Sequence, residues 1–184
     1  MSKHIKIIGL YGAQKAGKSS VAKTITQLDS NWVRVSFATP IRQMLNAITN
    51  SPLVDPFADK EQPLDILCGR SVRYALQRLG TEWGRNMIGS DIWIKVLEER
   101  IKSYSCNGIV IDDLRMQNEM EFIKSRGGCI VKVVRDLQSN EVERHASELD
   151  WHNWTPDYVV NNNSSMDDSA NRTLSFVNTF FNNN

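Results

Sequence analysis

The chain has few cysteines and no long hydrophobic run. Only Cys68, Cys106 and Cys129 occur among its 184 residues, and none belongs to a C-x-x-C pair. An odd number of widely spaced cysteines argues against a disulfide framework and against a structural zinc site. No apolar stretch approaches the roughly 20 residues that cross a bilayer. We therefore expect a reduced, cytoplasmic protein that makes no use of a membrane.

The chain also lacks an excess of charge of either sign. It carries 22 Lys and Arg residues against 21 Asp and Glu residues, so its net charge is +1. This balance argues against a protein that binds nucleic acid through bulk positive charge. A local anion site is compatible with it, provided that a few donors are placed together. The length, with 41% hydrophobic residues, suits a single domain with its own core.

Short apolar runs alternate with helical patterns along the chain. The patterns predict strands at 5–10, 32–37, 108–113, 129–134 and 158–160, and helices at about 17–28, 40–46, 71–79, 91–101, 119–125 and 170–180. The proline-containing segment 50–63 predicts an exposed loop or arm. Strands that alternate with helices indicate an α/β sandwich with a mostly parallel sheet, in which ligands bind beyond the carboxyl ends of the strands.

Residues 12–19 match the phosphate-loop pattern G-x-x-x-x-G-K-[ST] at every fixed position. They stand between the first predicted strand and the first predicted helix, which is the context that the pattern requires. The glycines let successive N–H groups converge on an anion, and the helix N-terminus adds its dipole. Lys18 would bridge the β- and γ-phosphates, and the Ser19 hydroxyl would serve Mg²⁺. The predicted ATP-binding residues are Gly12, Ala13, Gln14, Lys15, Ala16, Gly17, Lys18, Ser19 and Ser20.

Charged residues follow the later strands of the predicted sheet. Asp112 and Asp113 end the third strand, where a carboxylate can hold Mg²⁺ or its waters, or can simply cap a turn. Arg115 can bind an acceptor phosphate as a bidentate fork, or can form a surface ion pair with Glu119. Three further arginines fit either a cleft and lid or solvated surface positions: Arg42, Arg135 and Arg144.

The sequence outside the phosphate loop, together with the chain length, narrows the class of reaction. We find no guanine-reading N-K-x-D segment, and the length suits a small-molecule kinase better than an oligomeric ATPase. Two alternatives stay open from the residues alone. One is a dephospho-coenzyme-A kinase or another small-metabolite kinase, and the other is a P-loop ATPase without a phosphoryl acceptor.

Four blocks resemble the deoxynucleoside monophosphate kinases of tailed bacteriophages, a group within the adenylate-kinase-like P-loop kinases. The blocks are Gly12–Ser19, Ser36-Phe37-Ala38-Thr39-Pro40-Ile41-Arg42, Leu76–Arg85 continuing to Asp91-Ile92-Trp93, and Asp113–Glu119. A weaker match lies at His145-Ala146-Ser147-Glu148. The third and fourth blocks are much more specific to this family than the phosphate loop is. One departure is Thr39, which stands where family members often carry an aspartate.

The resemblance implies a three-layer fold with a five-stranded parallel sheet, ATP as donor, Mg²⁺ as cofactor, and a deoxynucleoside 5′-monophosphate as acceptor. It implies one kinase domain over 1–184, with a helical acceptor-binding insertion at about 40–105 and a lid at about 135–156. Such a protein is a monomer or homodimer that supplies nucleotides for DNA synthesis in a host cytoplasm, without binding nucleic acid directly.

The resemblance also implies roles for individual residues. Ser19 and Asp113 would bind the metal. The residues with catalytic roles would be Lys18, Arg115, Arg135 and Arg144. The residues that bind the acceptor would be Arg42, Arg73, Gln77, Trp83, Arg85, Asp91 and Arg115.

Overall fold

The computed structural model describes residues 5–49, 60–135, 150–163 and 165–182. The chain divides into two compact units. The first unit contains Met1–Ser36 and Tyr104–Asn184, and the second contains Phe37–Ser103. The second unit is therefore one continuous stretch that interrupts the first in the sequence.

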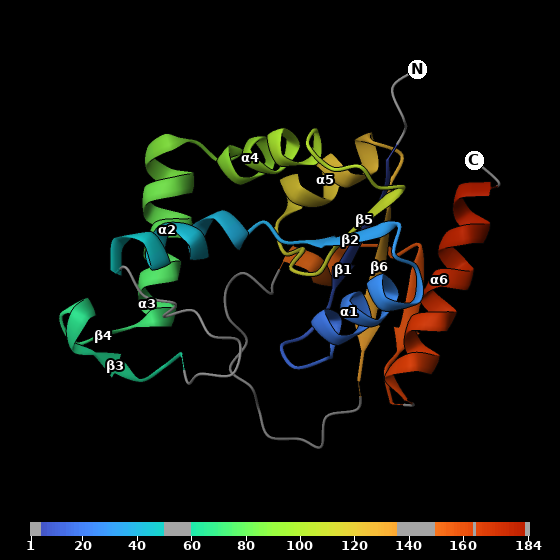
Figure 1. Cartoon of the computed structure of the whole chain (residues 1–184), viewed down its shortest axis with the longest axis horizontal. Coiled ribbons are helices and arrows are strands. Elements are labelled where there is room, and N and C mark those ends of the chain that lie inside the picture. The colour runs from blue at the N-terminus through green and yellow to red at the C-terminus, as the bar shows by residue number, and fades with distance from the viewer. Residues whose placement is uncertain (1–4, 50–59, 136–149, 164, 183–184) are drawn as a thin grey trace. The chain divides into compact units, whose positions relative to one another are not determined.

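A five-stranded sheet forms the centre of the first unit (Figure 1). Its strands are β1 (Lys6–Tyr11), β2 (Trp32–Val35), β5 (Gly108–Ile111), β6 (Cys129–Val134) and β7 (Tyr158–Asn161). Their order across the sheet is β2-β5-β1-β6-β7, and every neighbouring pair is parallel. The predicted fold class is confirmed, including the third predicted strand as a neighbour of the first. Because all carboxyl ends meet at one edge, the segments that follow β1, β2, β5 and β6 share that edge.

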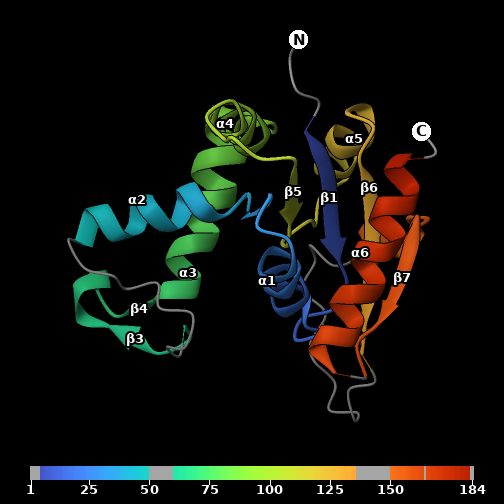
Figure 2. The ribbon, with the colours of Figure 1, turned by 45° about the vertical axis from the view of Figure 1, so that its right-hand side comes forward.

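Helices cover both faces of this sheet (Figure 2). On one face lie α1 (Lys18–Leu28) and α6 (Met166–Asn182), which share a hydrophobic core with alternate sheet residues such as Ile8 and Val110. On the other face lies α5 (Gln117–Ser125), whose Ile123 packs against Gly9 so closely that a Cβ atom there would lie 2.5 Å from Ile123 Cδ1. The alternation of inward residues along β1 thus builds a three-layer sandwich.

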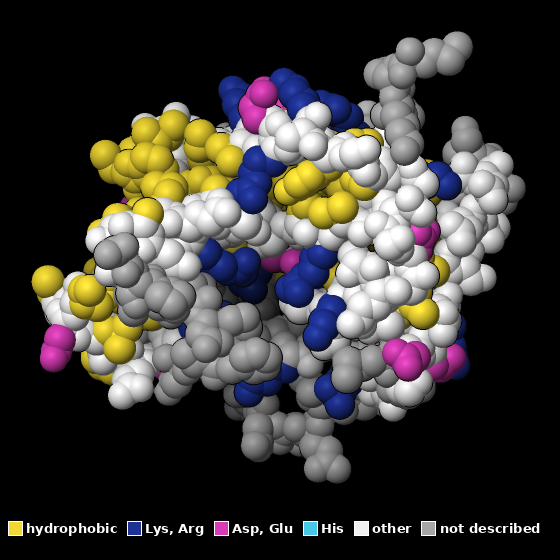
Figure 3. Space-filling model, in the orientation of Figure 1, with side chains coloured by type: hydrophobic (Ala, Val, Ile, Leu, Met, Phe, Trp, Pro, Cys, Tyr) yellow, Lys and Arg dark blue, Asp and Glu magenta, His cyan; other side chains and the backbone are white. Residues whose placement is uncertain are grey.

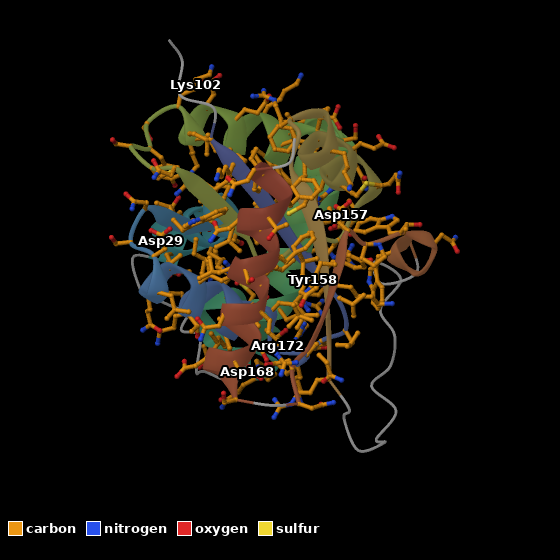
Figure 4. The ribbon with its side chains drawn as sticks, turned by 90° about the vertical axis from the view of Figure 1, so that its right-hand side faces the viewer. Asp29, Lys102, Asp157, Tyr158, Asp168 and Arg172 are labelled. Carbon is orange, nitrogen blue, oxygen red and sulfur yellow. The ribbon has the colours of Figure 1, made fainter. Side chains whose placement is uncertain are left out.

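Helix α6 is longer than the sequence pattern predicts. Its first turn carries Asp167 and Asp168, so it gives no apolar signal. Asp168 pairs with Arg172 one turn later at 2.8 Å, and Figure 4 shows the two on successive turns of α6. Tyr158 at the start of β7 stacks on Phe176, with ring centroids 4.5 Å apart. The helix is therefore anchored to the edge strand by aromatic packing.

The second unit consists mainly of helices. Its elements are α2 (Thr39–Thr49), β3 (Pro63–Leu64), the 3₁₀ turn η1 (Asp65–Leu67), β4 (Arg70–Ser71), α3 (Val72–Gln77), the π-helix η2 (Arg78–Ile88) and α4 (Ile92–Ile101). The short hairpin of β3 and β4 is a feature that the sequence pattern did not predict. Within the predicted arm 50–63, residues 50–59 lie outside the described residues.

The π-helix η2 replaces the end of the predicted helix 71–79. Trp93, which is 3% exposed, donates from Nε1 to the carbonyl of Gly80 at 2.8 Å. Its ring lies where a Cβ atom at Gly84 would be 2.4 Å away. The wider helix therefore follows from a tertiary contact with α4. Hydrophobic side chains are exposed at its end, Met87 (74%) and Ile88 among them, and Figure 3 shows such side chains on the surface of this unit.

Along the described parts of the chain, no helix combines the length and the apolar character that crossing a bilayer would require.

Candidate active site

The phosphate loop, residues 12–19, follows β1 and leads into α1. Gly12 has φ +139° and Gly17 has φ +96°, values that favour glycine. A Cβ atom at Gly12 would lie 2.2 Å from the carbonyl oxygen of Val133, so the loop passes directly against the end of β6. Lys15 also has a left-handed conformation, with φ +64°. The loop is thus a compact turn that the glycines permit.

Lys18 lies in the first turn of α1 and reaches back over the loop. Its Nζ donates to the carbonyls of Gly12 and Ala13, at 2.8 Å each. The first N–H groups of α1 have no partner within the helix, and the N-cap residue Gly17 has no side chain to accept from them. One ammonium group and several N–H donors are therefore brought together at the positive end of the helix dipole.

The two carboxylates after β5 have different surroundings. Asp112 is 4% exposed, and its Oδ2 accepts from Nε and Nη2 of Arg34 at 2.9 Å and 2.6 Å. Asp113 is only half-buried, and its Oδ2 accepts from the Ser36 hydroxyl at 2.6 Å. Asp112 thus pairs with an arginine of a neighbouring strand, and Asp113 accepts from the residue that follows β2.

Arg115 lies in the turn between β5 and α5, with its side chain exposed. The buried carboxylate of Glu119 accepts from the main-chain N–H groups of Arg115 and Met116, at 3.0 Å and 3.1 Å. The guanidinium makes no ion pair among the described residues, and Glu119 shapes the turn that carries it. This contact explains part of the Asp113–Glu119 block in structural terms.

An aromatic cluster stands beside the loop on the α5 face. Tyr11, the last residue of β1, has its ring centroid 6.0 Å from Trp151 and 5.2 Å from Trp154. Burial, followed by the negative charge of Asp157, raises the pKa of Tyr11 to about 12. Burial and the same aspartate also raise the pKa of the Cys129 thiol to about 12. Both groups are neutral at physiological pH, so they serve packing here.

The remaining predicted site residues fall into the two units as follows. Arg135 follows β6 in the first unit and is exposed, whereas Arg144 and most of the predicted lid lie outside the described residues. The second unit contains the other predicted acceptor residues: Arg42 in α2, Arg73 and Gln77 in α3, Trp83 and Arg85 in η2, and Asp91 immediately before α4. Arg73 is paired with Glu61.

Sequence reasoning missed Arg34 and Asn162, which shape this region, and it predicted Glu119 only as an ion-pair partner of Arg115. Arg34 neutralises Asp112, Glu119 holds the Arg115 turn, and Asn162 donates from Nδ2 to the carbonyl of Ala16 in the loop at 2.9 Å. Glu119 was open to detection, because a glutamate three residues after a helix start is typical of capping. No local sequence pattern indicates the roles of Arg34 and Asn162.

The fold and this loop define the class as an α/β P-loop protein. The structure resembles TT1252 from Thermus thermophilus with a TM-score of 0.56 and 16% identity, covering 96% of this chain and 98% of that chain. It resembles the dephospho-CoA kinase from Campylobacter jejuni with a TM-score of 0.52 and 13% identity, covering 96% of this chain and 98% of that chain. At these identities the likeness shows the fold alone.

The sequence narrows the class to one family. Residues 57–172, more than half of the chain, match the model of the deoxynucleotide monophosphate kinase family, and the chain belongs to that family of phosphotransferases. A protein of Acanthamoeba polyphaga mimivirus, provisionally named a deoxynucleotide monophosphate kinase, is 26% identical over 189 residues, covering 93% of this chain and 95% of that protein. The predicted kinase family is confirmed, and the link to bacteriophages stays a prediction.

Proposed function

We propose that the protein transfers the γ-phosphoryl group of ATP to a deoxynucleoside 5′-monophosphate, which yields a deoxynucleoside diphosphate and ADP. The observation that carries the proposal is the phosphate loop of a nucleotide kinase, with Lys18 Nζ 2.8 Å from two loop carbonyls. Nucleotide supply for DNA synthesis is the role that follows from this reaction. Its substrates are small molecules, so no direct contact with nucleic acid is needed.

On the donor side, the proposal assigns the phosphates of ATP to residues 12–20. The loop N–H groups and the positive end of α1 attract the anion, because they are donors without partners in the helix. Lys18 would exchange its carbonyl contacts for the β- and γ-phosphates. Its positive charge would then balance the negative charge that the phosphates carry in the transition state.

Magnesium is the metal that we propose for this reaction. Ser19 and Asp113 would hold it, directly or through its waters, and Mg²⁺ would neutralise phosphate charge when bound. The residues fit, since Mg²⁺ prefers oxygen ligands and binds few protein groups beside the substrate phosphates.

On the acceptor side, we propose Arg115 as the main ligand of the 5′-phosphate. Its exposed guanidinium stands on a turn that Glu119 fixes. The second unit would bind the rest of the acceptor through Arg42, Arg73, Gln77, Trp83, Arg85 and Asp91. Arg135 and Arg144 would belong to a lid at about 135–156 that closes over the γ-phosphate.

The chemistry asks little of the protein beyond positioning. An oxygen of the acceptor phosphate is already anionic, so it attacks the γ-phosphorus without a general base. The bond from that phosphorus to the β-phosphate oxygen breaks, and ADP leaves. Catalysis then consists of alignment and charge neutralisation, with no covalent intermediate on the enzyme.

The test is a coupled assay of ADP formation with ATP and a panel of acceptors. The panel contains the deoxynucleoside monophosphates, the ribonucleoside monophosphates and dephospho-CoA. Lys18→Ala should lower kcat by at least about 100-fold, because it removes charge that the transition state needs, while the melting temperature stays close to wild type. Lys23→Ala, an exposed lysine of the same helix, is the matched control and should retain activity.

Three results would contradict the proposal. Turnover of Lys18→Ala near the wild-type rate would remove the loop from the mechanism. A preference for dephospho-CoA would assign another acceptor. ATP hydrolysis that no monophosphate affects would indicate an ATPase without a phosphoryl acceptor.

A further inference from the structure

Asn162 is a buried amide that connects the end of β7 to the phosphate loop. It is 6% exposed, and its main-chain N–H donates to the carbonyl of Val134 at 2.7 Å, which continues the ladder between β6 and β7. Its side-chain Nδ2 donates to the carbonyl of Ala16 at 2.9 Å, across 146 residues of sequence. One side chain therefore joins the edge strand of the sheet to the loop.

The same amide fills the space beside Gly17. A Cβ atom at Gly17 would lie 2.1 Å from Nδ2 of Asn162, so no other residue fits there without moving it. Gly17 has φ +96°, which independently favours glycine. Asn162 and Gly17 are thus in close contact, and this contact restricts how the amide can turn.

The hydrogen bond fixes the direction of the peptide group between Ala16 and Gly17. A trans peptide is planar, and its C=O and N–H point in opposite directions. The described residues contain no cis peptide bond. Because the Ala16 carbonyl points at Asn162, the Gly17 N–H points away from it. Main-chain N–H groups of such loops are the groups that bind phosphate.

The other end of the amide argues against a purely stabilising role. Oδ1 of Asn162 is buried and accepts no hydrogen bond from any described residue. A buried acceptor without a partner lowers stability, which offsets part of what the Nδ2 hydrogen bond contributes. The amide at this position is therefore best explained by what its Nδ2 holds.

We propose that Asn162 is a positioning residue for the donor nucleotide. By holding the Ala16 carbonyl, it keeps the Gly17 N–H directed away from the sheet edge and available to a phosphate oxygen. The inference rests on the proposed function, since it assigns the loop to ATP. It implies an effect on the donor alone, because the side-chain hydrogen bond of Asn162 goes to the loop.

The experiment compares Asn162→Leu and Asn162→Asp with wild type, and uses Asn163→Ala as the control at an adjacent exposed position. Binding of a non-hydrolysable ATP analogue with Mg²⁺ is measured by calorimetry, and KM is measured for each substrate. Asn162→Leu should lose about tenfold in analogue affinity, or about 1.4 kcal/mol. KM for ATP should rise to match, and KM for the monophosphate should stay within twofold.

Asn162→Asp should bind the analogue more weakly still. A carboxylate cannot donate to the Ala16 carbonyl, and it adds negative charge beside the phosphates. This variant has nearly the same shape as the wild type, so it tests the same contact if Asn162→Leu does not fold. Asn163→Ala should behave as wild type.

Wild-type analogue affinity in Asn162→Leu and Asn162→Asp would overturn the proposal, and so would an equal rise in both KM values. These outcomes are separate from failure of the proposed function. A wild-type protein that binds the analogue but phosphorylates no monophosphate would refute the function, and the binding data would still decide the role of Asn162. A wild-type protein that binds no analogue would refute both.

Discussion

The hydroxyl group of Tyr11 is buried beside the phosphate loop without a hydrogen-bond partner among the described residues. Such a group contributes packing through its ring and a penalty through its oxygen. Tyr11→Phe keeps the ring between Trp151 and Trp154 and removes the oxygen. We expect the free energy of unfolding to stay equal or to rise by up to about 1 kcal/mol, measured by urea denaturation at pH 7. A loss above about 1 kcal/mol would show that the hydroxyl has a partner.

The same residue predicts how stability changes in alkali. The folded state raises the pKa of Tyr11 to about 12 from an ordinary value near 10, so the unfolded chain loses this proton first as the pH rises. The contribution of this raised pKa to the free energy of unfolding is complete below pH 10. It is lost between about pH 10 and 12, at about 1.4 kcal/mol per pH unit. Cys129 adds a similar loss that starts near pH 9. Urea denaturation from pH 8 to 11.5 should show a shallower decline for Tyr11→Phe, and equal slopes would contradict the assignment.

Residues of the site differ in how far the sequence alone could reveal them. The turn that carries Lys18 and Ser19 was predictable because its residues are contiguous, so the pattern contains the whole connection between β1 and α1. Asn162 contacts Ala16 across 146 residues, and Arg34 meets Asp112 only because β2 and β5 are neighbours. Such contacts depend on strand order, which a single sequence does not specify.

Among the elements, the π-helix η2 depends most on a neighbour. Gly84→Ala places a methyl group 2.4 Å from Cζ2 of the buried Trp93 ring, which has little room to move. We expect a loss of about 1–3 kcal/mol in the free energy of unfolding, as in other overpacked cores. Thermal denaturation measures it, with Asn86→Ala as the control at an exposed position of the same helix. A Gly84→Ala protein as stable as the control would show that Trp93 does not confine η2.

At the scale of elements, the strands of the sheet were predictable and η2 was not. β5 and β6 are almost entirely buried, so they consist of short apolar runs. The period of η2 is set by Trp93, whose indole donates to the Gly80 carbonyl and occupies the place of a side chain at Gly84. The sequence pattern predicts an α-helix at the start of η2, and the tertiary contact with Trp93 overrides that prediction.

For the whole molecule, the proposed function predicts separable responses to the two substrates. Arg115→Ala should leave the stabilisation by Mg²⁺ and ATP unchanged, at about 2.7 kcal/mol when ATP is at 100 times its Kd. It should lose most of the stabilisation by a deoxynucleoside monophosphate, because the guanidinium would bind the acceptor phosphate. Differential scanning calorimetry with each ligand makes the comparison, and Arg172→Ala on α6 is the arginine control. Equal loss of both responses would contradict the assignment of Arg115.

The interruption of the first unit by residues 37–103 affects how the chain acquires its structure during synthesis. The second unit is continuous, so it can complete its own contacts as soon as Ser103 has left the ribosome. The central strand β1 is made first, yet its neighbours β5 and β6 emerge about a hundred residues later. Contacts this distant in sequence form slowly and leave edges exposed in the meantime. The nascent N-terminal segment that holds the phosphate loop is therefore the part that would gain most from a chaperone.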